Sequence, residues 1–208
     1  MRDSVEMISS AEFLDDLQEQ SFGSAGDATR TAYPASNRMS GLQIAAYLAR
    51  RKYLVLATAR PDGRPHAAMS SYVLAERSFW LPTDTGTARV RNLETNPRAS
   101  VVVTEGEESH HIVVLAEGSA ELVGGHEASD GSSAWRAKFG RHPEWANSWI
   151  SIVPDKLFSY AASGALEGEL RVFRCRSCGD TFPAHDFSAV SCPSCGGSVI
   201  ETAGEPLL

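Results

Sequence analysis

The amino-acid sequence predicts a mainly β protein, a small antiparallel β-barrel with a few helices, followed by a small metal-binding segment. Five or six short strand patterns, spread over about 120 residues with few helical patterns between them, are typical of such a barrel. The pair Asp62-Gly63 between two of these strands is a strong β-hairpin signal. All four cysteines lie near the C-terminal end. We therefore expect a barrel domain and a separate cysteine-containing tail.

The first 39 residues carry little of a barrel pattern. One short amphipathic stretch, residues 11–20, precedes residues 21–38, which are rich in Gly, Ser, Ala and Thr. We interpret residues 1–39 as an arm that is flexible or lies over a partner. A helix follows, with Ser40 as its N-cap and apolar residues near one helical face.

The barrel segment alternates strand patterns with turns and one clear helix. The expected strands, dense in Val and Ile or alternating in polarity, are residues 53–59, 65–75, 77–83, 99–105, 110–123 and 150–162. Gly63 relieves the steric cost of positive φ in the first hairpin. A helix is expected from Gly86 or Thr87 to the residue before Pro97, and residues 164–168 read as a linker into the tail.

The overall charge excludes some classes of partner. Nineteen basic residues against 26 acidic ones give a net charge of −7, so no positive field favours nucleic acid. The longest apolar runs are far shorter than the roughly 20 residues that span a bilayer, and we expect no membrane segment. The N-terminal residues lack the basic start and apolar stretch of a secretory signal, which predicts a cytoplasmic protein.

A candidate anion site lies between a strand and the following helix, in residues 83–93. Backbone N–H groups at a helix start favour a phosphate, and guanidinium and hydroxyl groups add hydrogen bonds to it. The side chains that can converge there are Thr83, Thr85, Thr87, Arg89 and Arg91. The same pattern also fits an N-capped surface helix with solvated arginines, and the sequence alone leaves both interpretations open.

Two blocks of sequence carry a family resemblance, LATARPDGRPH at residues 56–66 and TGTARVRNLETNPRASV at residues 85–101. With these blocks in this order, residues 40–162 resemble the flavin-binding split-barrel family, which includes pyridoxamine 5'-phosphate oxidase and deazaflavin reductases. The resemblance implies a domain at residues 40–165, a six-stranded antiparallel split barrel of the FMN-binding type. It also implies a homodimer with the cofactor in a cleft between the subunits.

The resemblance also implies cofactor contacts. Arg89 stands where the family has a Lys or Arg that holds the cofactor phosphate. Met69, Ser70 and Ser71 would lie against the isoalloxazine ring, and Ala57 with Thr58 would line the neighbouring strand. With the anion site, the candidate cofactor residues are Ala57, Thr58, Met69, Ser70, Ser71, Thr83, Thr85, Thr87, Arg89 and Arg91. No catalytic acid or base is assigned, because a bound flavin performs the redox step itself.

Several cofactors and activities remain open within this resemblance. FMN is expected, because a terminal phosphate suits a compact bidentate partner such as Arg89, and a deazaflavin or haem is the alternative. The expected activity is oxidation or reduction of a small molecule. The competing hypothesis is a non-catalytic protein that carries the cofactor or docks a protein through its tail. Pyridoxamine phosphate oxidation is not expected, since the cysteine tail replaces the Arg- and Trp-containing end of that oxidase.

Residues 171–201 contain two Cys-x-x-Cys-Gly knuckles, with the four thiols Cys175, Cys178, Cys192 and Cys195. In a reducing compartment this spacing favours metal over disulfides. Four thiolates without a matching histidine or carboxylate predict a closed, structural site. The tail resembles a zinc ribbon and also a rubredoxin-type iron site, so zinc is the expected ion and iron the alternative.

Overall fold

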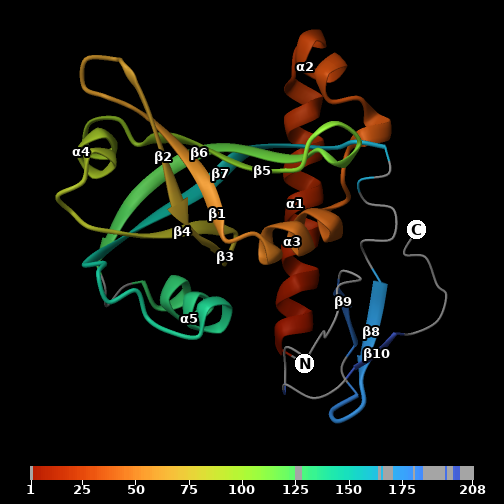
Figure 1. The fold of residues 1–208 in the computed structure, drawn as a ribbon. Coiled ribbons are helices and arrows are strands. Elements are labelled where there is room, and N and C mark those ends of the chain that lie inside the picture. Colours follow the sequence, from red (N-terminus) through yellow and green to blue (C-terminus); the bar gives the residue numbers. More distant parts are fainter. Residues whose placement is uncertain are drawn as a thin grey trace.

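The computed structural model describes residues 2–124, 128–163, 165, 171–179, 181–184, 195 and 199–201. Figure 1 shows a curled sheet with helices around it. Its strands are β1 (Tyr53–Ala59), β2 (Pro65–Ser71), β3 (Val73–Ala75), β4 (Ser78–Thr83), β5 (Arg98–Glu105), β6 (Ile112–Gly124) and β7 (Ser148–Ala161). The α-helices are α1 (Arg2–Ser24), α2 (Asp27–Ala32), α3 (Gly41–Arg50), α4 (Ala88–Thr95) and α5 (Ser129–Phe139), and short 3-10 turns occupy Ala35–Asn37 and Glu108–His110. No helix within these described residues combines the length and apolar content of a membrane crossing.

The main sheet confirms the predicted mainly β, antiparallel barrel. Its strands follow the order β2-β1-β5-β6-β7-β4-β3, and each neighbouring pair is antiparallel. β2 and β3 lie at opposite edges of this sheet, although only Tyr72 separates them along the chain. A single residue can join the two edges only because the sheet curls back on itself.

The sheet has seven described strands where six were expected, because residues 65–75 divide at Tyr72. The Tyr72 side chain is fully buried, and its phenol donates a hydrogen bond to the Leu48 carbonyl at 2.9 Å. Its ring centroid lies 5.9 Å from that of Phe79. Burial of this ring turns the chain inward, so the residues before and after it join different edges.

Two local predictions are confirmed. Across the Asp62-Gly63 turn, the Arg60 N–H donates to the Arg64 carbonyl at 2.8 Å, and Gly63 has a φ of +82°. At the start of α3, Ser40 and Gln43 exchange side-chain and backbone hydrogen bonds in a capping box. Both devices depend only on residues close together in sequence, which explains why their sequence signals were sufficient.

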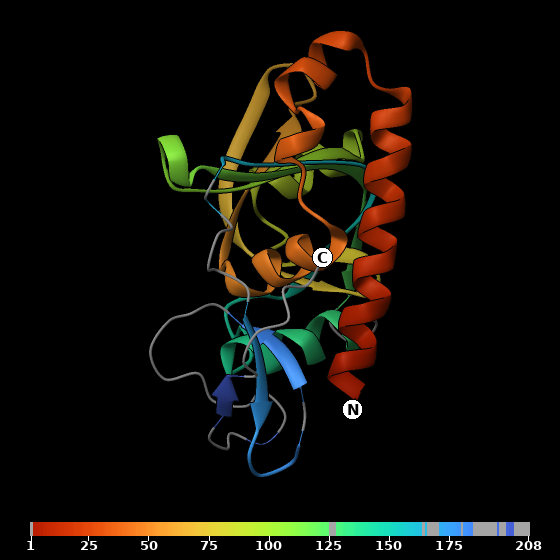
Figure 2. The same ribbon diagram turned by 90° about the vertical axis from the view of Figure 1, so that its right-hand side faces the viewer.

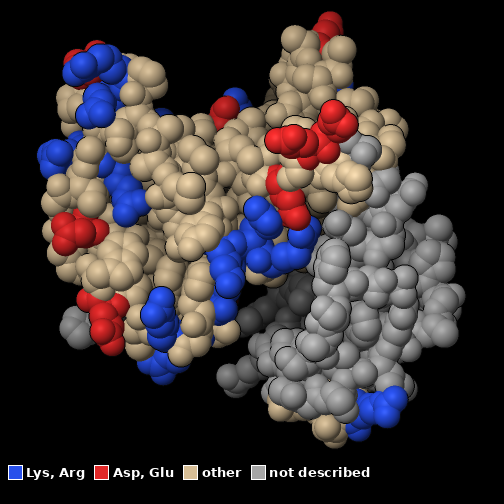
Figure 3. All heavy atoms as spheres, viewed as in Figure 1, with Lys and Arg blue, Asp and Glu red and all other residues tan. Residues whose placement is uncertain are grey.

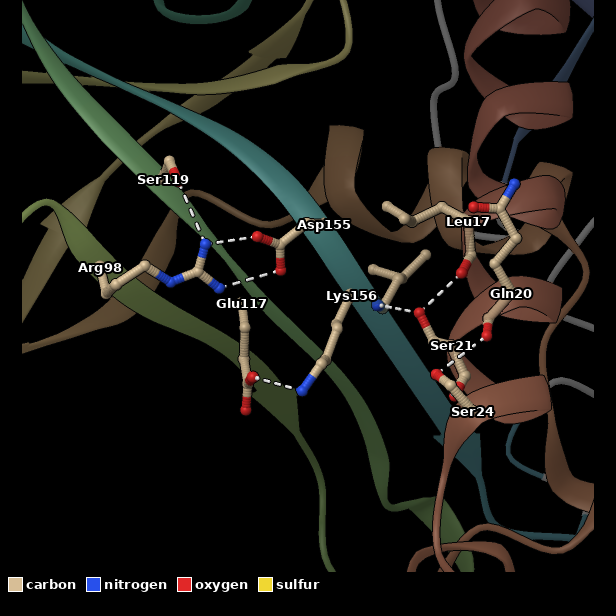
Figure 4. A network of polar contacts seen from close by, with 10 residues as sticks. Leu17, Gln20, Ser21, Ser24, Arg98, Glu117, Ser119, Asp155 and Lys156 are labelled. Carbon is tan, nitrogen blue, oxygen red and sulfur yellow. Dashed lines mark hydrogen bonds and ion pairs between the residues drawn. The ribbon is translucent and has the colours of Figure 1, made fainter.

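The N-terminal segment, expected as an arm that is flexible or lies over a partner, contains a long helix in the described structure. α1 runs beside β7 and α3 (Figures 1 and 2), and its Leu14, Leu17 and Phe22 side chains are buried. The backbone N–H of Leu157 in β7 donates to Ser21 Oγ at 2.8 Å, a contact visible in Figure 4. The amphipathic pattern was present in the sequence, but the surface that receives it is assembled from β7 and α3, far along the chain.

A continuous apolar core lies inside the curled sheet and beneath α1 and α3. Its fully buried side chains include Ile44, Leu48, Leu54, Leu56, Leu81 and Ile150. A second, smaller cluster consists of Val73, Trp80, Ala128, Trp135 and Trp149, and it holds α5 against β3 and β4. Phe79 and Leu81 of β4 belong to the first cluster and Trp80 to the second, so the two clusters pack on opposite faces of β4, after which the candidate anion site begins.

The cysteine tail forms a separate antiparallel sheet in the order β10-β8-β9. Its strands are β8 (Arg171–Cys175), β9 (Thr181–Ala184) and β10 (Val199–Glu201). Cys175 ends β8, so the first knuckle follows directly from a strand.

Candidate functional site

Three of the predicted anion-site residues come together where β4 ends and α4 begins. The Arg89 Nε atom donates to Thr83 Oγ1 at 3.0 Å, and Thr83 Oγ1 lies 3.4 Å from Thr87 Oγ1. Thr83 is fully buried at the end of β4, whereas Thr87 and Arg89 are half-buried. We call Thr83, Thr87 and Arg89 the guanidinium cluster.

The cluster carries a positive charge without a counter-ion among the residues that the structure describes. Burial lowers the pKa of Arg89, and no described carboxylate forms an ion pair with it. A guanidinium remains charged at any physiological pH, so its partial desolvation is uncompensated. The cluster therefore has the charge and the hydrogen-bond donors that an anion such as a phosphate monoester requires.

The other two predicted anion-site residues make different contacts. The Thr85 N–H donates to Asn147 Oδ1 at 3.0 Å, and the Thr85 side chain is exposed. The Arg91 side chain is also exposed, and its Nη1 donates to the Gly86 carbonyl at 2.7 Å. Both contacts brace the loop between β4 and α4. The arrangement thus separates Arg89, which faces Thr83, from Arg91, which holds the loop.

A buried polar chain lies behind the cluster, and the sequence prediction missed two of its members. Thr58 Oγ1 accepts a hydrogen bond from Asn92 Nδ2 at 2.9 Å and lies 3.3 Å from His66 Nδ1. Asn92 and Thr58 are 2% and 6% exposed. Asn92 could have been found from the sequence, because it lies next to the apolar Leu93 on a short helix. A polar side chain that is buried in this way needs a hydrogen-bond partner inside the protein.

Of the predicted ring-contact residues, Met69 and Ser71 lie on the outer face of β2, whereas Ser70 lies on its buried face. Met69 is 70% exposed, and it pairs across the hairpin with Val55, which is 38% exposed. Ser70 is buried, and Ser71 is half-buried beside a cleft of about 590 Å³. Aromatic residues line much of this cleft: Tyr53, Trp135, Phe139 and Trp145. Figure 3 shows the uncharged surface over β1 and β2.

Ala57 and Thr58 lie further along β1, opposite Ala67 and His66. They line a second, smaller hollow of about 360 Å³, together with Gly63, Arg98, Glu117 and neighbouring residues of β1 and β5. Arg98 is paired with Asp155 across this outer face, and Glu117 with Lys156 (Figure 4). The charges of Arg98 and Glu117 are thus matched within the chain, unlike that of Arg89.

Three of the four predicted metal ligands come together in the tail. The Sγ atoms of Cys175, Cys178 and Cys195 lie within 4.8 Å of one another, and the Cys175–Cys195 separation is 3.5 Å. With Zn–S bonds near 2.3 Å, tetrahedral geometry places sulfur atoms about 3.8 Å apart, so this spacing suits one ion. Cys192, the fourth predicted ligand, lies outside the described residues.

Backbone hydrogen bonds favour the thiolate form of Cys175. The N–H of Cys178 and, to a lesser degree, that of Ser177 lower the pKa of the Cys175 thiol to about 6. Their N···S distances are 3.5 Å and 3.3 Å. The thiolate is the form that binds metal, so the knuckle prepares Cys175 as a ligand.

Comparison with known proteins identifies the family of the barrel. The family profile described as pyridoxamine 5'-phosphate oxidase matches residues 42–167, more than half of the chain. The chain belongs to the pyridoxamine 5'-phosphate oxidase family. A curated member of this family, the pyridoxine/pyridoxamine 5'-phosphate oxidase of Rubrobacter xylanophilus, is 36% identical over 95 residues. That alignment covers 45% of this chain and 42% of the relative, so the chain spans less than half of the relative's length.

Several solved structures align with this chain, and one of them shares its fold. A conserved hypothetical protein from Mycobacterium tuberculosis aligns with a TM-score of 0.57 at 27% identity, over 65% of this chain and 92% of the other. The haem storage protein HutZ from Vibrio cholerae aligns with a TM-score of 0.49 at 20% identity, over 58% of this chain and 95% of its own. A FAD-binding protein from Mesorhizobium loti has a TM-score of 0.49 at 23% identity, with coverages of 58% and 92%. The last two scores carry no information about the function of this chain.

Proposed function

We propose that this chain is a cytoplasmic, homodimeric flavoprotein that binds FMN and oxidises or reduces a small molecule. The observation that carries the proposal is Arg89, a half-buried cation with no described counter-ion, whose Nε donates to Thr83 Oγ1, which in turn lies 3.4 Å from Thr87 Oγ1. A phosphate monoester would supply the negative charge that balances Arg89 and would accept hydrogen bonds from its guanidinium N–H groups. Membership of the pyridoxamine 5'-phosphate oxidase family supports a flavin over other phosphorylated ligands.

The residues of this chain would divide the work of holding FMN. Arg89, Thr83 and Thr87 would bind its phosphate. The β2 backbone from Met69 to Ser71 would orient the ring, and the aromatic residues around the adjoining cleft would exclude water from one side. Bound FMN supplies the hydride or electron transfer. The substrate is proposed to differ from that of the Rubrobacter enzyme, because a cysteine-containing segment follows the barrel and the alignment covers 42% of that enzyme.

An apolar row on the outer face of the sheet supports the proposed homodimer. Met69 pairs with Val55, Val55 with Val102, and Val102 with Leu115, so the row crosses four adjacent strands. None of these four side chains is fully buried. A second copy would cover this row and close the cleft beside Ser71. Sedimentation at micromolar concentration should give the mass of a dimer, and a monomer would contradict this part of the proposal.

We also propose that the tail binds one structural zinc ion through Cys175, Cys178, Cys195 and Cys192. The close approach of three thiols and the hydrogen bonds to Cys175 support a metal site. Iron is the alternative ion for the same four thiolates. A closed site of this kind would hold the tail together and take no direct part in the reaction.

The visible spectrum of freshly purified protein tests the cofactor directly. FMN should give flavin bands near 375 and 450 nm, typical of any oxidised flavin. A deazaflavin or haem band would replace FMN in the proposal, and a colourless protein that takes up no added FMN would contradict it. Turnover with NAD(P)H and an artificial electron acceptor should then separate an enzyme from a cofactor carrier.

Replacement of Arg89 should weaken FMN binding. The Arg89→Ala variant is expected to bind FMN about 10- to 150-fold more weakly, because a charge-assisted hydrogen bond contributes about 1.5–3 kcal/mol. Quenching of flavin fluorescence measures the dissociation constant. Arg91→Ala is the matched control, since it also removes one guanidinium from α4. The Arg91 side chain lies two residues from Arg89 and donates to the Gly86 carbonyl in the loop before the helix. Equal affinity in native protein and Arg89→Ala would remove Arg89 from the site.

A further inference from the structure

A buried hydrogen-bond chain connects α4 to the β1–β2 hairpin. Asn92 of α4 donates to Thr58 of β1 at 2.9 Å, and Thr58 lies 3.3 Å from His66 Nδ1 on β2. Thr58 and Asn92 are almost completely buried, and His66 is half-buried. The family resemblance offered Thr58 as a cofactor contact, but its hydroxyl group is engaged on the side that faces α4.

The direction of the first hydrogen bond in this chain is fixed, and that of the second depends on the His66 tautomer. The Asn92 amide nitrogen can only donate, so Thr58 Oγ1 accepts from it. The single hydroxyl hydrogen of Thr58 then remains for His66 Nδ1, which accepts it when the ring carries its proton on Nε2. Each hydrogen bond in the chain thus has one donor and one acceptor. Loss of the Thr58 hydroxyl group would leave the buried Asn92 amide without this partner.

The same face of α4 carries both Asn92 and Arg89. Residues three apart on a helix lie on neighbouring parts of its surface. Arg89 bonds to Thr83 at the end of β4, and Asn92 bonds to Thr58 on β1. The remaining buried side chains of this eight-residue helix include Val90 and Leu93, whose apolar contacts do not define a direction. Two directional contacts on one face therefore fix the rotation of α4 about its axis.

We propose that Thr58 is a positioning residue, which holds α4 through Asn92 at the rotation that directs Arg89 toward a bound anion. His66 completes the chain by accepting the Thr58 hydroxyl hydrogen. This inference rests on the proposed FMN site for its functional consequence, while its structural part concerns α4 alone. It assigns a role in cofactor binding to Asn92 and His66, and it moves Thr58 from direct contact to support.

Hydrogen exchange of the α4 amides tests the structural part without any ligand. Thr58→Val removes the hydroxyl group with little change in shape, whereas Thr58→Ser keeps it. We expect the amides of residues 88–95 to exchange on the order of tenfold faster in Thr58→Val, as local opening becomes easier. Exchange in Thr58→Ser and in the β5–β6 strands of all three proteins should remain as in the native chain. Equal α4 exchange in the three proteins, or a uniform acceleration over the whole chain, would overturn the inference.

FMN affinity tests the functional part through a double-mutant cycle. Thr58→Val should weaken FMN binding about 5- to 20-fold in the native background, within the range of one lost hydrogen bond. The same change should have almost no effect in Arg89→Ala, because Thr58 acts through the position of Arg89. Equal losses in both backgrounds would show that Thr58 acts independently and would overturn its positioning role. Absence of FMN binding by the native chain would contradict the proposed function, and the exchange experiment would still decide the role of Thr58.

Discussion

A Cys175→Ser variant is expected to lose the metal of the tail. We expect about one zinc ion per chain in the native protein and less than about a tenth of that in the variant. A serine hydroxyl stays protonated at neutral pH and is a poor ligand, whereas the native thiol is prepared as a thiolate by two backbone N–H groups. The remaining thiols cannot complete a tetrahedron. Elemental analysis of protein purified anaerobically measures the effect.

The loss of metal should also unfold the small sheet of the tail. Structural zinc contributes about 10–16 kcal/mol to the folding of small zinc domains, far more than three short strands can supply. Hydrogen exchange or limited proteolysis should therefore show β8–β10 open in Cys175→Ser, with the barrel unchanged. Ser177→Ala is the matched control, because the Ser177 side chain is exposed and only its backbone N–H reaches Cys175.

The outcomes of this experiment separate the site from the ion. Native metal content in Cys175→Ser would exclude Cys175 as a ligand, and a metal-free native protein would contradict the metal site itself. Iron with thiolate charge-transfer bands would confirm a four-thiolate site and replace zinc by a rubredoxin-type centre.

A Gly41→Ala variant should be destabilised by about 3 kcal/mol, which is typical of overpacking against a rigid neighbour. A Cβ atom on Gly41 would lie 2.0 Å from the Ala11 carbonyl oxygen, a backbone atom of α1. The Gly41 N–H also donates to Asp15 Oδ1 at 2.6 Å, so the start of α3 cannot move away without breaking that bond. α1 must shift to accept the methyl group. Urea unfolding followed by circular dichroism measures the change in the free energy of unfolding.

Gly23→Ala is the matched control for this prediction. Gly23 lies in α1, the helix against which Gly41 packs, and no atom would come within 4 Å of an added Cβ. The free energy of unfolding of Gly23→Ala should exceed the native value by up to about 1 kcal/mol, because alanine favours a helix over glycine. Native stability in Gly41→Ala would contradict the packing of α1 on α3.

The features predicted correctly from the sequence are those whose cause is local. The Asp62-Gly63 hairpin sets its own register, and the Ser40–Gln43 capping box closes within one turn of α3. The helix after Gly86 was expected to stop before Pro97, and α4 ends at Thr95. Once the hairpin register is known, the pairing of Thr58 with His66 also follows from the sequence. That step would have drawn attention to the polar chain behind the candidate site.

The features missed depend on residues far apart in the chain. The pattern of residues 65–75 is continuous, and only the contacts of Tyr72 with the Leu48 carbonyl and the Phe79 ring explain why Tyr72 turns inward. The amphipathic stretch of α1 indicated a buried face, but its receiving surface comes from α3 and β7. The local anion-site pattern treats Arg89 and Arg91 alike, and only the family resemblance singles out Arg89. Their different roles follow from Thr83, which the end of β4 brings beside Arg89 alone.

The sequence by itself determined the mainly β class, the first hairpin, the helix caps and the four-cysteine spacing, because short-range sterics and ligand geometry govern each of them. The tertiary structure decided which of the candidate residues face one another. It brought three thiols within reach of one ion, left the half-buried Arg89 without a described counter-ion, and buried Asn92 against Thr58. Such contacts form only when distant strands pair and the core excludes water, and burial is what makes an unpaired charge or a missing hydrogen bond costly.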